Sequence, residues 1–283
     1  MSLGAILTAV VTPMNPDGSI DEPGFVELLA WCAKNGSDGF VVCGTTGEAP
    51  TLTTEEHLRM IELAVQERPA GTTVIAGAGS NDTAHAVAMT SRAAELGADA
   101  ILSVTPYYNR PNRRGVRAHY EAIAAASDLP IVLYNIPSRT GLDLPNDQLA
   151  ELAEIPSVRY VKQANPDNLA PVDGLGIYAG NDDMLAEVLD MGGEGGILVA
   201  SHLVGRQMRE MVDDPGRRAE LDAQLRPFFD SLGVTTNPIP IKAALSMMGL
   251  PAGPLRLPLV EATDAERATV REAMVAAGLE PTS

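Results

Sequence analysis

The stretch Ser157–Asn168, "SVRYVKQANPDN", joins a short apolar run to a polar end, and this pattern recurs along the chain. Val158, Tyr160 and Val161 predict a buried strand, and Lys162 follows at its end. Near-continuous apolar runs of this length are typical of strands that are covered on both faces. Eight such runs occur, at Ala5–Val11, Gly39–Cys43, Thr73–Ala78, Ala100–Val104, Ile131–Tyr134, Val158–Val161, Gly176–Ala179 and Gly196–Val199.

Helical patterns separate most of these runs. Thr53–Glu56 has the composition of a capping box, and Asp82–Leu96 predicts a helix that ends at Gly97. Similar patterns occupy Asn112–Ala126 and Asp182–Met191. Strands that alternate with helices predict an α/β fold, and eight of them predict a (β/α)₈ TIM barrel.

An open, doubly wound sheet is the alternative to the barrel. Its dinucleotide-binding form needs the motif GxGxxG after a strand, and the nearest candidate, Gly77–Asp82, lacks the third glycine. Beyond about residue 215 only helices are predicted, near residues 221–232, 239–248 and 265–277. We therefore expect a catalytic barrel at residues 1–215 and a C-terminal helical extension at residues 216–283.

Composition excludes several classes of partner. The net charge is −17 and the isoelectric point is about 4.5, which argues against binding to nucleic acid or to an anionic membrane. No apolar run approaches the roughly 20 residues of a membrane span, and no signal peptide opens the chain, so we expect a cytoplasmic protein. Cys32, Cys43 and the four scattered histidines match no metal-binding spacing, so no metal is predicted.

The use of lysine makes Lys162 a candidate nucleophile. Of twenty basic residues only Lys34, Lys162 and Lys242 are lysines, so the chain uses arginine wherever charge alone is needed. A desolvated lysine can lose its proton and attack a carbonyl, which arginine does not do. The alternative is a lysine whose ammonium reaches the surface at the end of a strand.

Polar residues follow several of the predicted strands. In a barrel the carboxyl ends of the strands meet at one rim, so we expect these side chains to face one cavity. They are found at Gly44–Glu48, Thr105–Asn109, Tyr134–Gly141, Lys162 and Gly180–Asp182.

Each group at this rim has a chemical use. The glycines Gly44 and Gly47 allow a turn whose amides and threonine hydroxyls bind a carboxylate. Tyr134 can pass protons to and from an imine, and Arg139 can hold a second carboxylate with its planar fork. Taken singly, these residues also suit an ordinary loop, a core tyrosine and a solvated arginine. Together with Lys162 they favour a lysine that forms a Schiff base.

Five segments, taken in order, carry a resemblance to a known family. They are "GTTGE" (44–48), "TPYYN" (105–109), "YNIPSRTG" (134–141), the lysine of the sixth strand, and "NPIPIK" (237–242). The chain resembles the dihydrodipicolinate synthase and N-acetylneuraminate lyase family of pyruvate-dependent class I aldolases, from Thr12 to about residue 257. It is more similar to the synthases, because the lyases have a serine after the first glycine and no arginine that matches Arg139.

The resemblance implies a reaction and a set of catalytic residues. It implies condensation of pyruvate with L-aspartate 4-semialdehyde to 4-hydroxy-tetrahydrodipicolinate, in diaminopimelate and lysine biosynthesis. Lys162 would form the imine with pyruvate. Thr45, Tyr134 and Tyr108 would relay protons, and Tyr108 would reach into the site of a neighbouring subunit.

It also implies substrate-binding groups and an assembly. Thr46, with nearby backbone amides such as those at Gly44, would bind the pyruvate carboxylate, and Arg139 would bind that of the semialdehyde. Ile197 matches a position whose backbone carbonyl faces the substrate. The family needs no organic cofactor and is commonly a homotetramer built as a dimer of dimers.

The chain departs from the synthase pattern directly after Lys162. Synthases usually have an acidic residue there, whereas this chain has Gln163, and Pro166 reshapes the loop that follows. Two alternatives stay open. One is another pyruvate aldolase, or a keto-acid dehydratase, that acts on sugar acids, and the other is a barrel that senses a ligand without catalysis.

A second departure concerns inhibition by lysine. In the relatives that lysine inhibits, a glutamate on the third helix binds it, and the matching residue here is His85. Two further residues of that cleft are the apolar Ala49 and Pro50, while Asn81, His57 and Tyr107 match the family. We therefore expect lysine to inhibit weakly or not at all.

Overall fold

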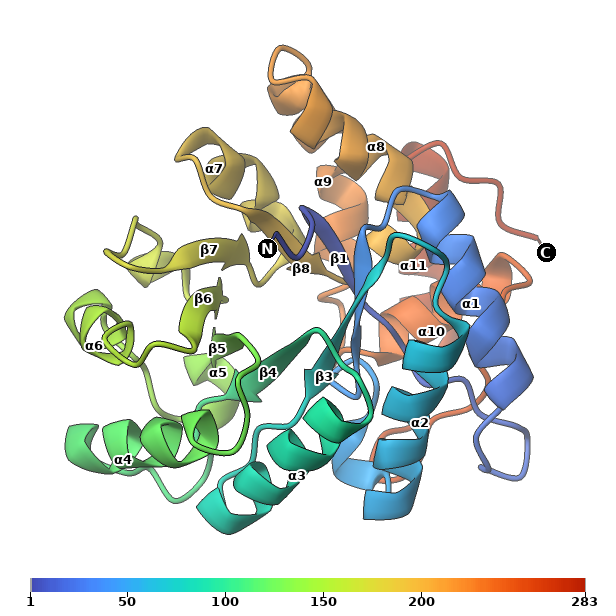
Figure 1. Ribbon diagram of the computed structural model, residues 1–283. Helices are drawn as coiled ribbons and strands as arrows, with labels where there is room; N and C mark the ends of the chain where they lie inside the picture. Colours follow the sequence, from blue (N-terminus) through green and yellow to red (C-terminus); the bar gives the residue numbers. More distant parts are fainter. Residues whose placement is uncertain (1, 283) are drawn as a thin grey trace.

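The computed structural model describes residues 2–282 and contains a closed barrel of eight parallel strands (Figure 1). Each strand pairs with its neighbours in sequence, and β1 also pairs with β8, which closes the ring. The strands are β1 (Ile6–Ala9), β2 (Gly39–Val42), β3 (Thr73–Gly77), β4 (Ala100–Val104), β5 (Ile131–Asn135), β6 (Val158–Gln163), β7 (Gly176–Ala179) and β8 (Gly195–Leu198).

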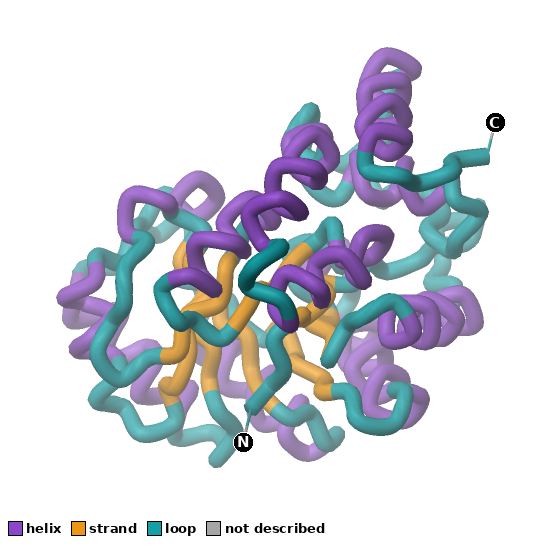
Figure 2. The backbone as a smooth tube through the Cα atoms, turned by 90° about the horizontal axis from the view of Figure 1, so that it is seen from above, coloured by secondary structure: helices purple, strands orange, loops and turns teal. Residues whose placement is uncertain are grey.

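Helices surround this ring of strands (Figure 2). The α-helices are α1 (Glu22–Lys34), α2 (Thr54–Glu67), α3 (Thr83–Glu95), α4 (Arg113–Ala124), α5 (Pro137–Thr140), α6 (Asn146–Leu152), α7 (Leu185–Asp190), α8 (Ser201–Asp213), α9 (Arg218–Ser231), α10 (Ile239–Met247) and α11 (Asp264–Ala276). The 3₁₀ helices are η1 (Ala49–Thr51), η2 (Pro166–Asn168) and η3 (Asp182–Met184).

The barrel predicted from the apolar runs is confirmed. All eight runs form strands, and their ends lie within two residues of the expected positions. The open-sheet alternative is wrong, because Leu7 of β1 pairs with Ile197 of β8 and leaves no sheet edge. β6 is longer than expected and includes Lys162 and Gln163, so Lys162 lies inside the strand. Beyond β6 only η2 forms before β7.

Local chemistry explains where the helices begin and end. The hydroxyl of Thr53 accepts a hydrogen bond from the backbone N–H of Glu56, whose carboxylate accepts from the N–H of Thr53, so the expected capping box is present. At α3 and α4 the side chains of Asp82 and Asn112 accept a hydrogen bond from a backbone N–H of the first turn, without the reciprocal bond of a capping box. Gly97 follows α3 with φ of +90°, a conformation that glycine adopts without a steric penalty.

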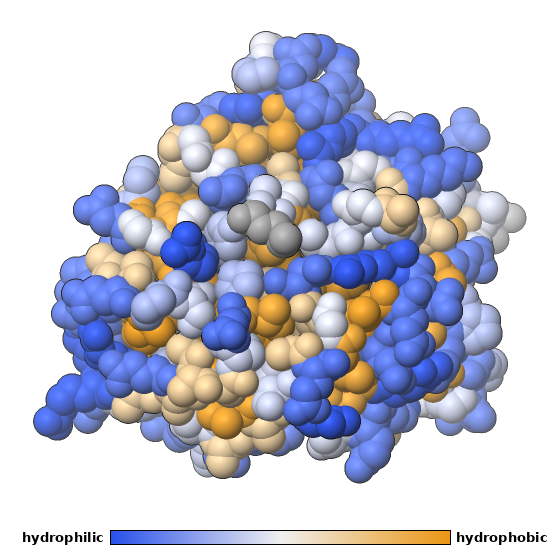
Figure 3. Space-filling view, viewed as in Figure 1, coloured by the Kyte–Doolittle hydropathy of each residue, from blue (hydrophilic) through white to orange (hydrophobic). Residues whose placement is uncertain are grey.

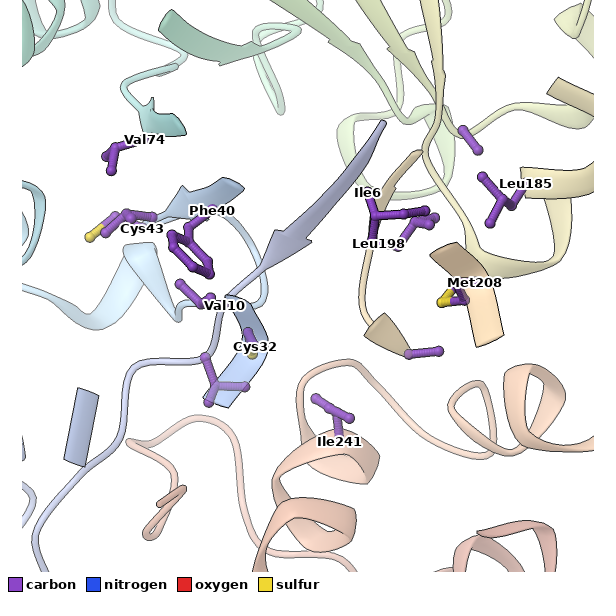
Figure 4. Packing of buried hydrophobic residues seen from close by; sticks show 14 of the residues in the cluster. Ile6, Val10, Cys32, Phe40, Cys43, Val74, Leu185, Leu198, Met208 and Ile241 are labelled. Atoms are coloured by element: carbon purple, nitrogen blue, oxygen red, sulfur yellow. The ribbon is translucent and has the colours of Figure 1, made fainter. Parts of the chain in front are cut away.

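The apolar core has two layers. One fills the inside of the barrel, where residues such as Leu7, Val41 and Ile75 are fully buried. The other lies between the strands and the helices, and Figure 4 shows Phe40 and Ile241 in it. Each such side chain contributes about 1.5–3 kcal/mol on burial. On the face shown in Figure 3 hydrophilic residues predominate, and apolar residues appear between them.

The C-terminal helices follow the eighth β/α unit. In Figure 1, α9, α10 and α11 lie on the same side of the molecule as α1 and α8. α10 is buried along nearly its whole length, from Ile239 to Met247, so it is part of the core. The boundary expected at residue 215 falls between α8 and α9, and the division into two units stays a prediction. No helix within residues 2–282 has the length and apolar character that crossing a membrane needs.

Candidate active site

A cavity of about 620 Å³ opens at the carboxyl ends of the barrel strands. Four of the residues expected at the site line it, namely Gly44, Thr45, Tyr134 and Arg139. The loop before α10 contributes Asn237 to the same wall. The cavity is therefore built jointly by the strand ends and the C-terminal extension.

Lys162 lies beside Tyr134 because the two residues are paired in register on neighbouring strands, β5 and β6. The Lys162 side chain is buried, with 5% of the residue exposed, and its Nζ lies 4.3 Å from the centre of the Tyr134 ring. Tyr134 forms the cavity wall, so the amine lies against a lining residue and is shielded from bulk water. This is the environment in which an amine can serve as a nucleophile.

The turn after β2 presents hydrogen-bond donors. It is closed by hydrogen bonds from the N–H of Gly47 to the carbonyl of Gly44 and from the N–H of Glu48 to the carbonyl of Thr45, both 3.1 Å long. Among residues 2–282 no acceptor takes the backbone N–H of Thr45 or of Thr46. Two free amides beside two hydroxyls form a group that can bind a carboxylate.

Arg139 lies on α5 and is exposed at the cavity wall. Its Nη2 donates a hydrogen bond of 3.3 Å to the backbone carbonyl of Asn237. Most of its donors therefore remain available to a second anion. Ile197 is fully buried on β8 inside the barrel, and its side chain does not line the cavity.

Tyr108 points away from the cavity of its own chain. It is 90% exposed and has a left-handed φ of 69°, while the preceding Tyr107 lines the cavity. A large aromatic side chain so fully exposed is available to a second copy of the chain. The role of Tyr108 in a neighbouring subunit stays a prediction.

The expectation that the polar residues of the rim all face one cavity is wrong for several of them. Among those that do not line it are Thr46, Thr105, Tyr108, Asn109, Asn135, Lys162 and Asp182. Asn135 shows where such a side chain is held instead. Its amide donates to Asp143 at 2.9 Å and to Gln163 at 3.1 Å, behind the cavity wall. Asn165 and Asn168 also donate to the Asp143 carboxylate, at 3.2 and 2.7 Å. A buried amide has to find polar partners, and these lie between the β5 and β6 loops rather than in the cavity.

This network accounts for Gln163 at the position after Lys162. The side-chain oxygen Oε1 of Gln163 accepts from the Asn135 amide and from the backbone N–H of Asn165, at 3.1 and 3.0 Å. The single negative charge of the network lies on Asp143. The hydrogen-bond network joins the loop that carries Arg139 to the loop after Lys162.

Asp182 is a buried carboxyl near the site, although the sequence places it only among the polar residues of the rim. Its carboxylate accepts hydrogen bonds of 2.9 Å from the backbone N–H groups of Val199 and Ala200, just after β8. Burial raises its pKa to about 6, and these N–H groups and the Lys162 ammonium act in the opposite direction. A single aspartate in a polar loop gives no sequence signal of burial.

We expect Asp182 to make stability depend on pH. The folded pKa of about 6 exceeds the usual 3.8, so the folded protein binds the Asp182 proton more tightly than the unfolded chain does. The stability that this proton contributes is therefore lost as pH rises from about 4 to 6.5. The loss is on the order of 3 kcal/mol. Asp182→Asn keeps the acceptor and removes the titration. In urea unfolding, wild type should lose stability relative to the variant over this range, and a constant difference would contradict the assignment.

No set of three or more His, Cys, Asp and Glu side chains within the described residues is arranged to hold a metal ion. Glu48 is the one acidic residue in the cavity wall, and its carboxylate is paired with Lys242 at 2.6 Å. Arg139 also lines the cavity and, with Glu48 paired to Lys242, supplies a positive charge that can attract an anionic ligand.

Comparison with known proteins gives a family match over nearly the whole chain. Residues 2–277 match the model of the Dihydrodipicolinate synthetase family. The 4-hydroxy-tetrahydrodipicolinate synthase of Moorella thermoacetica is 45% identical, over 99% of this chain and 100% of its own length. That of Symbiobacterium thermophilum is 43% identical, over 98% and 99%.

Solved structures give the same result. A dihydrodipicolinate synthase from Acinetobacter baumannii, complexed with pyruvate, has a TM-score of 0.95 and 37% identity, over 99% of this chain and 100% of its own. The synthase from Cyanidioschyzon merolae with lysine bound has a TM-score of 0.93 and 39% identity, over 98% and 99%. The resemblance expected from the sequence motifs is thus confirmed over nearly the whole length, and the chain belongs to the dihydrodipicolinate synthetase family.

Proposed function

We propose that this chain is a Schiff-base lyase of the aldolase type that condenses pyruvate with L-aspartate 4-semialdehyde to 4-hydroxy-tetrahydrodipicolinate. This is a step of diaminopimelate and lysine biosynthesis. The observation that carries the proposal is the buried amine of Lys162 against Tyr134, whose side chain lines a cavity together with Thr45 and Arg139.

The first half of the reaction uses Lys162 and Tyr134. The neutral amine attacks C2 of pyruvate to form a carbinolamine, which loses water to give an imine. The Tyr134 ring lies directly beside the amine, and its hydroxyl is the group that would donate the proton the departing hydroxyl needs. Loss of a proton from C3 then produces an enamine, with the positive nitrogen as the electron sink.

The second half uses the other wall of the cavity. The enamine carbon attacks the aldehyde carbon of the semialdehyde, and the new alkoxide takes up a proton. The amino group of the semialdehyde then attacks the imine carbon, closes the ring and releases the Lys162 amine. Both substrates carry a carboxylate, for which the Thr45–Thr46 turn and Arg139 provide separate binding groups.

The relay of Thr45, Tyr134 and Tyr108 belongs to this proposal, and so does the backbone carbonyl of Ile197 facing the substrate. Tyr108 would complete the relay from a neighbouring subunit of a homotetramer, which its exposure allows. The chemistry needs no cofactor beyond the covalent imine on Lys162. A cytoplasmic location stays an expectation from the sequence.

The test is a condensation assay with purified protein. Incubation with pyruvate and aspartate semialdehyde should consume both in a 1:1 ratio and form the cyclic product. Mass spectrometry detects this product. Short sugar-acid aldehydes and sugar acids serve as the competing substrates. If the protein turns over these compounds but not the semialdehyde, the proposed substrate is wrong. The absence of any turnover would favour a ligand-sensing barrel.

We also expect free L-lysine to inhibit weakly or not at all. The side of the cavity lined by Ala49, His57 and His85 offers no free carboxylate, because Glu48 is paired with Lys242 and Glu56 with Arg256, both at 2.6 Å. Burial lowers the pKa of His57, which keeps this imidazole neutral. Lysine carries an ammonium on its side chain and another on its α-carbon, and both lack an anionic partner here.

Initial rates at saturating pyruvate with increasing L-lysine check this expectation. The loss of one desolvated charge pair is worth on the order of 2–5 kcal/mol, enough to move a submillimolar site beyond physiological concentrations. His85→Glu provides the matched gain-of-function variant and should lower the inhibitory concentration. Half-inhibition of the wild type at submillimolar lysine would contradict the expectation.

A further inference from the structure

The segment just before α10 contacts both anion-binding groups of the cavity. The Asn237 side-chain amide donates a hydrogen bond of 3.0 Å to the Thr46 hydroxyl, although the two residues are 191 positions apart. The Asn237 backbone carbonyl accepts the 3.3 Å hydrogen bond from Arg139. Asn237 is partly buried and lines the cavity between these two groups.

We propose that Asn237 is a positioning residue that sets the two carboxylate sites, its side chain acting on the pyruvate site and its backbone on the semialdehyde site. This inference rests on the proposed function. A threonine hydroxyl has one hydrogen to donate and two lone pairs that accept. Because Thr46 accepts from Asn237, its own hydrogen is left for another acceptor, which the pyruvate carboxylate supplies.

A buried ion pair holds this segment against the turn after β2. Lys242, on the first turns of α10, pairs with Glu48 at 2.6 Å, and the two side chains are 2% and 0% exposed. Lys242 also donates to the carbonyl of Pro254 at 2.8 Å. The second carboxylate oxygen of Glu48 accepts from the backbone N–H of Arg256 at 3.1 Å.

Because of this pair, the position of Asn237 depends on how the whole C-terminal extension packs against the barrel. Glu48 is two residues beyond Thr46, and Lys242 is five beyond Asn237, so the two segments are joined at both places. Burial lowers the pKa of Lys242, and the nearby Glu48 carboxylate opposes that effect. With both charges satisfied inside the protein, the pair holds the extension in one register on the barrel.

Two variants separate the side chain from the backbone. Asn237→Ala removes the bond to Thr46 and keeps the carbonyl that binds Arg139, so the KM for pyruvate should rise about 3- to 10-fold while that for the semialdehyde stays within twofold. Asn237→Asp has nearly the same shape but accepts from Thr46, which reverses that hydrogen bond. It also adds a negative charge between two carboxylate sites, so both KM values should rise more than tenfold.

Asn112→Asp is the matched control. Asn112 caps α4 outside the cavity wall, and aspartate caps a helix equally well, so this variant adds the same charge without touching either site. Its KM values should equal those of the wild type. Thermal unfolding of all variants, at one protein concentration, shows whether the fold is kept. If Asn237→Asp does not fold, the split between the two KM values in Asn237→Ala decides alone.

The outcomes separate this inference from the proposed function. Borohydride reduction of the wild type with pyruvate should leave an adduct on Lys162, and its absence would overturn the proposed function itself. If the adduct forms, equal increases in both KM values for Asn237→Ala would mean a purely structural role and overturn the inference. An unchanged pyruvate KM in either Asn237 variant would overturn it as well.

Discussion

Replacement of Lys162 by arginine is expected to leave the barrel folded and to abolish nearly all turnover. A guanidinium stays protonated and does not form an imine with pyruvate, so the loss should be on the order of 10⁴-fold or more, as for other removed nucleophiles. After incubation of the wild type with pyruvate and borohydride, mass spectrometry should find one adduct, on the peptide that contains Lys162.

The other two lysines are internal controls for this result. Lys34 is exposed at the end of α1, and Lys242 is held by Glu48 at 2.6 Å with 2% of its side chain exposed. Lys34→Arg should keep full activity and the adduct. Lys162→Met, which fits the buried site without a charge, should be folded and inactive. An adduct on Lys34 or Lys242, or none at all, would refute the mechanism.

Arg139→Ala is expected to act on the second substrate and to leave the first nearly unaffected. The arginine lies on α5 after β5, while the free amides of the Thr45–Thr46 turn follow β2. A charged bidentate contact is worth on the order of 2–4 kcal/mol, and we expect the lower end because Arg139 is exposed. The KM for the semialdehyde should therefore rise roughly 30-fold, with that for pyruvate within about threefold.

Arg139→Lys provides the comparison for this prediction. It keeps the positive charge and loses the planar fork, so its KM for the semialdehyde should fall between those of wild type and Arg139→Ala. Steady-state rates with each substrate varied at saturation of the other measure both constants. Equal increases in the two KM values of Arg139→Ala would show that the two carboxylate sites are not separate.

The C-terminal extension joins these two sites in the folded protein. The backbone carbonyl of Asn237 accepts from Arg139 and its side chain donates to Thr46, so one short segment contacts both sites.

Local sequence patterns determined the elements of this protein. The apolar run Val158–Val161 and the capping box at Thr53 depend only on residues a few positions apart, and both are present in the structure. The rarity of lysine singled out Lys162, and the family motifs pointed to Tyr134 and Arg139. The strand, the capping box and the choice of Lys162 rest on short-range chemistry or on counting residues. Both can be read directly from the sequence.

Only the tertiary structure decided how these residues are surrounded. Strand register brings Tyr134 to Lys162, and the packing of the C-terminal extension on the barrel brings Asn237 to Thr46 across 191 positions. Burial turns Asp182 from an ordinary polar residue into a carboxyl whose pKa is raised to about 6. Contacts between distant segments and the removal of water are set when the chain packs, so no local periodicity encodes them.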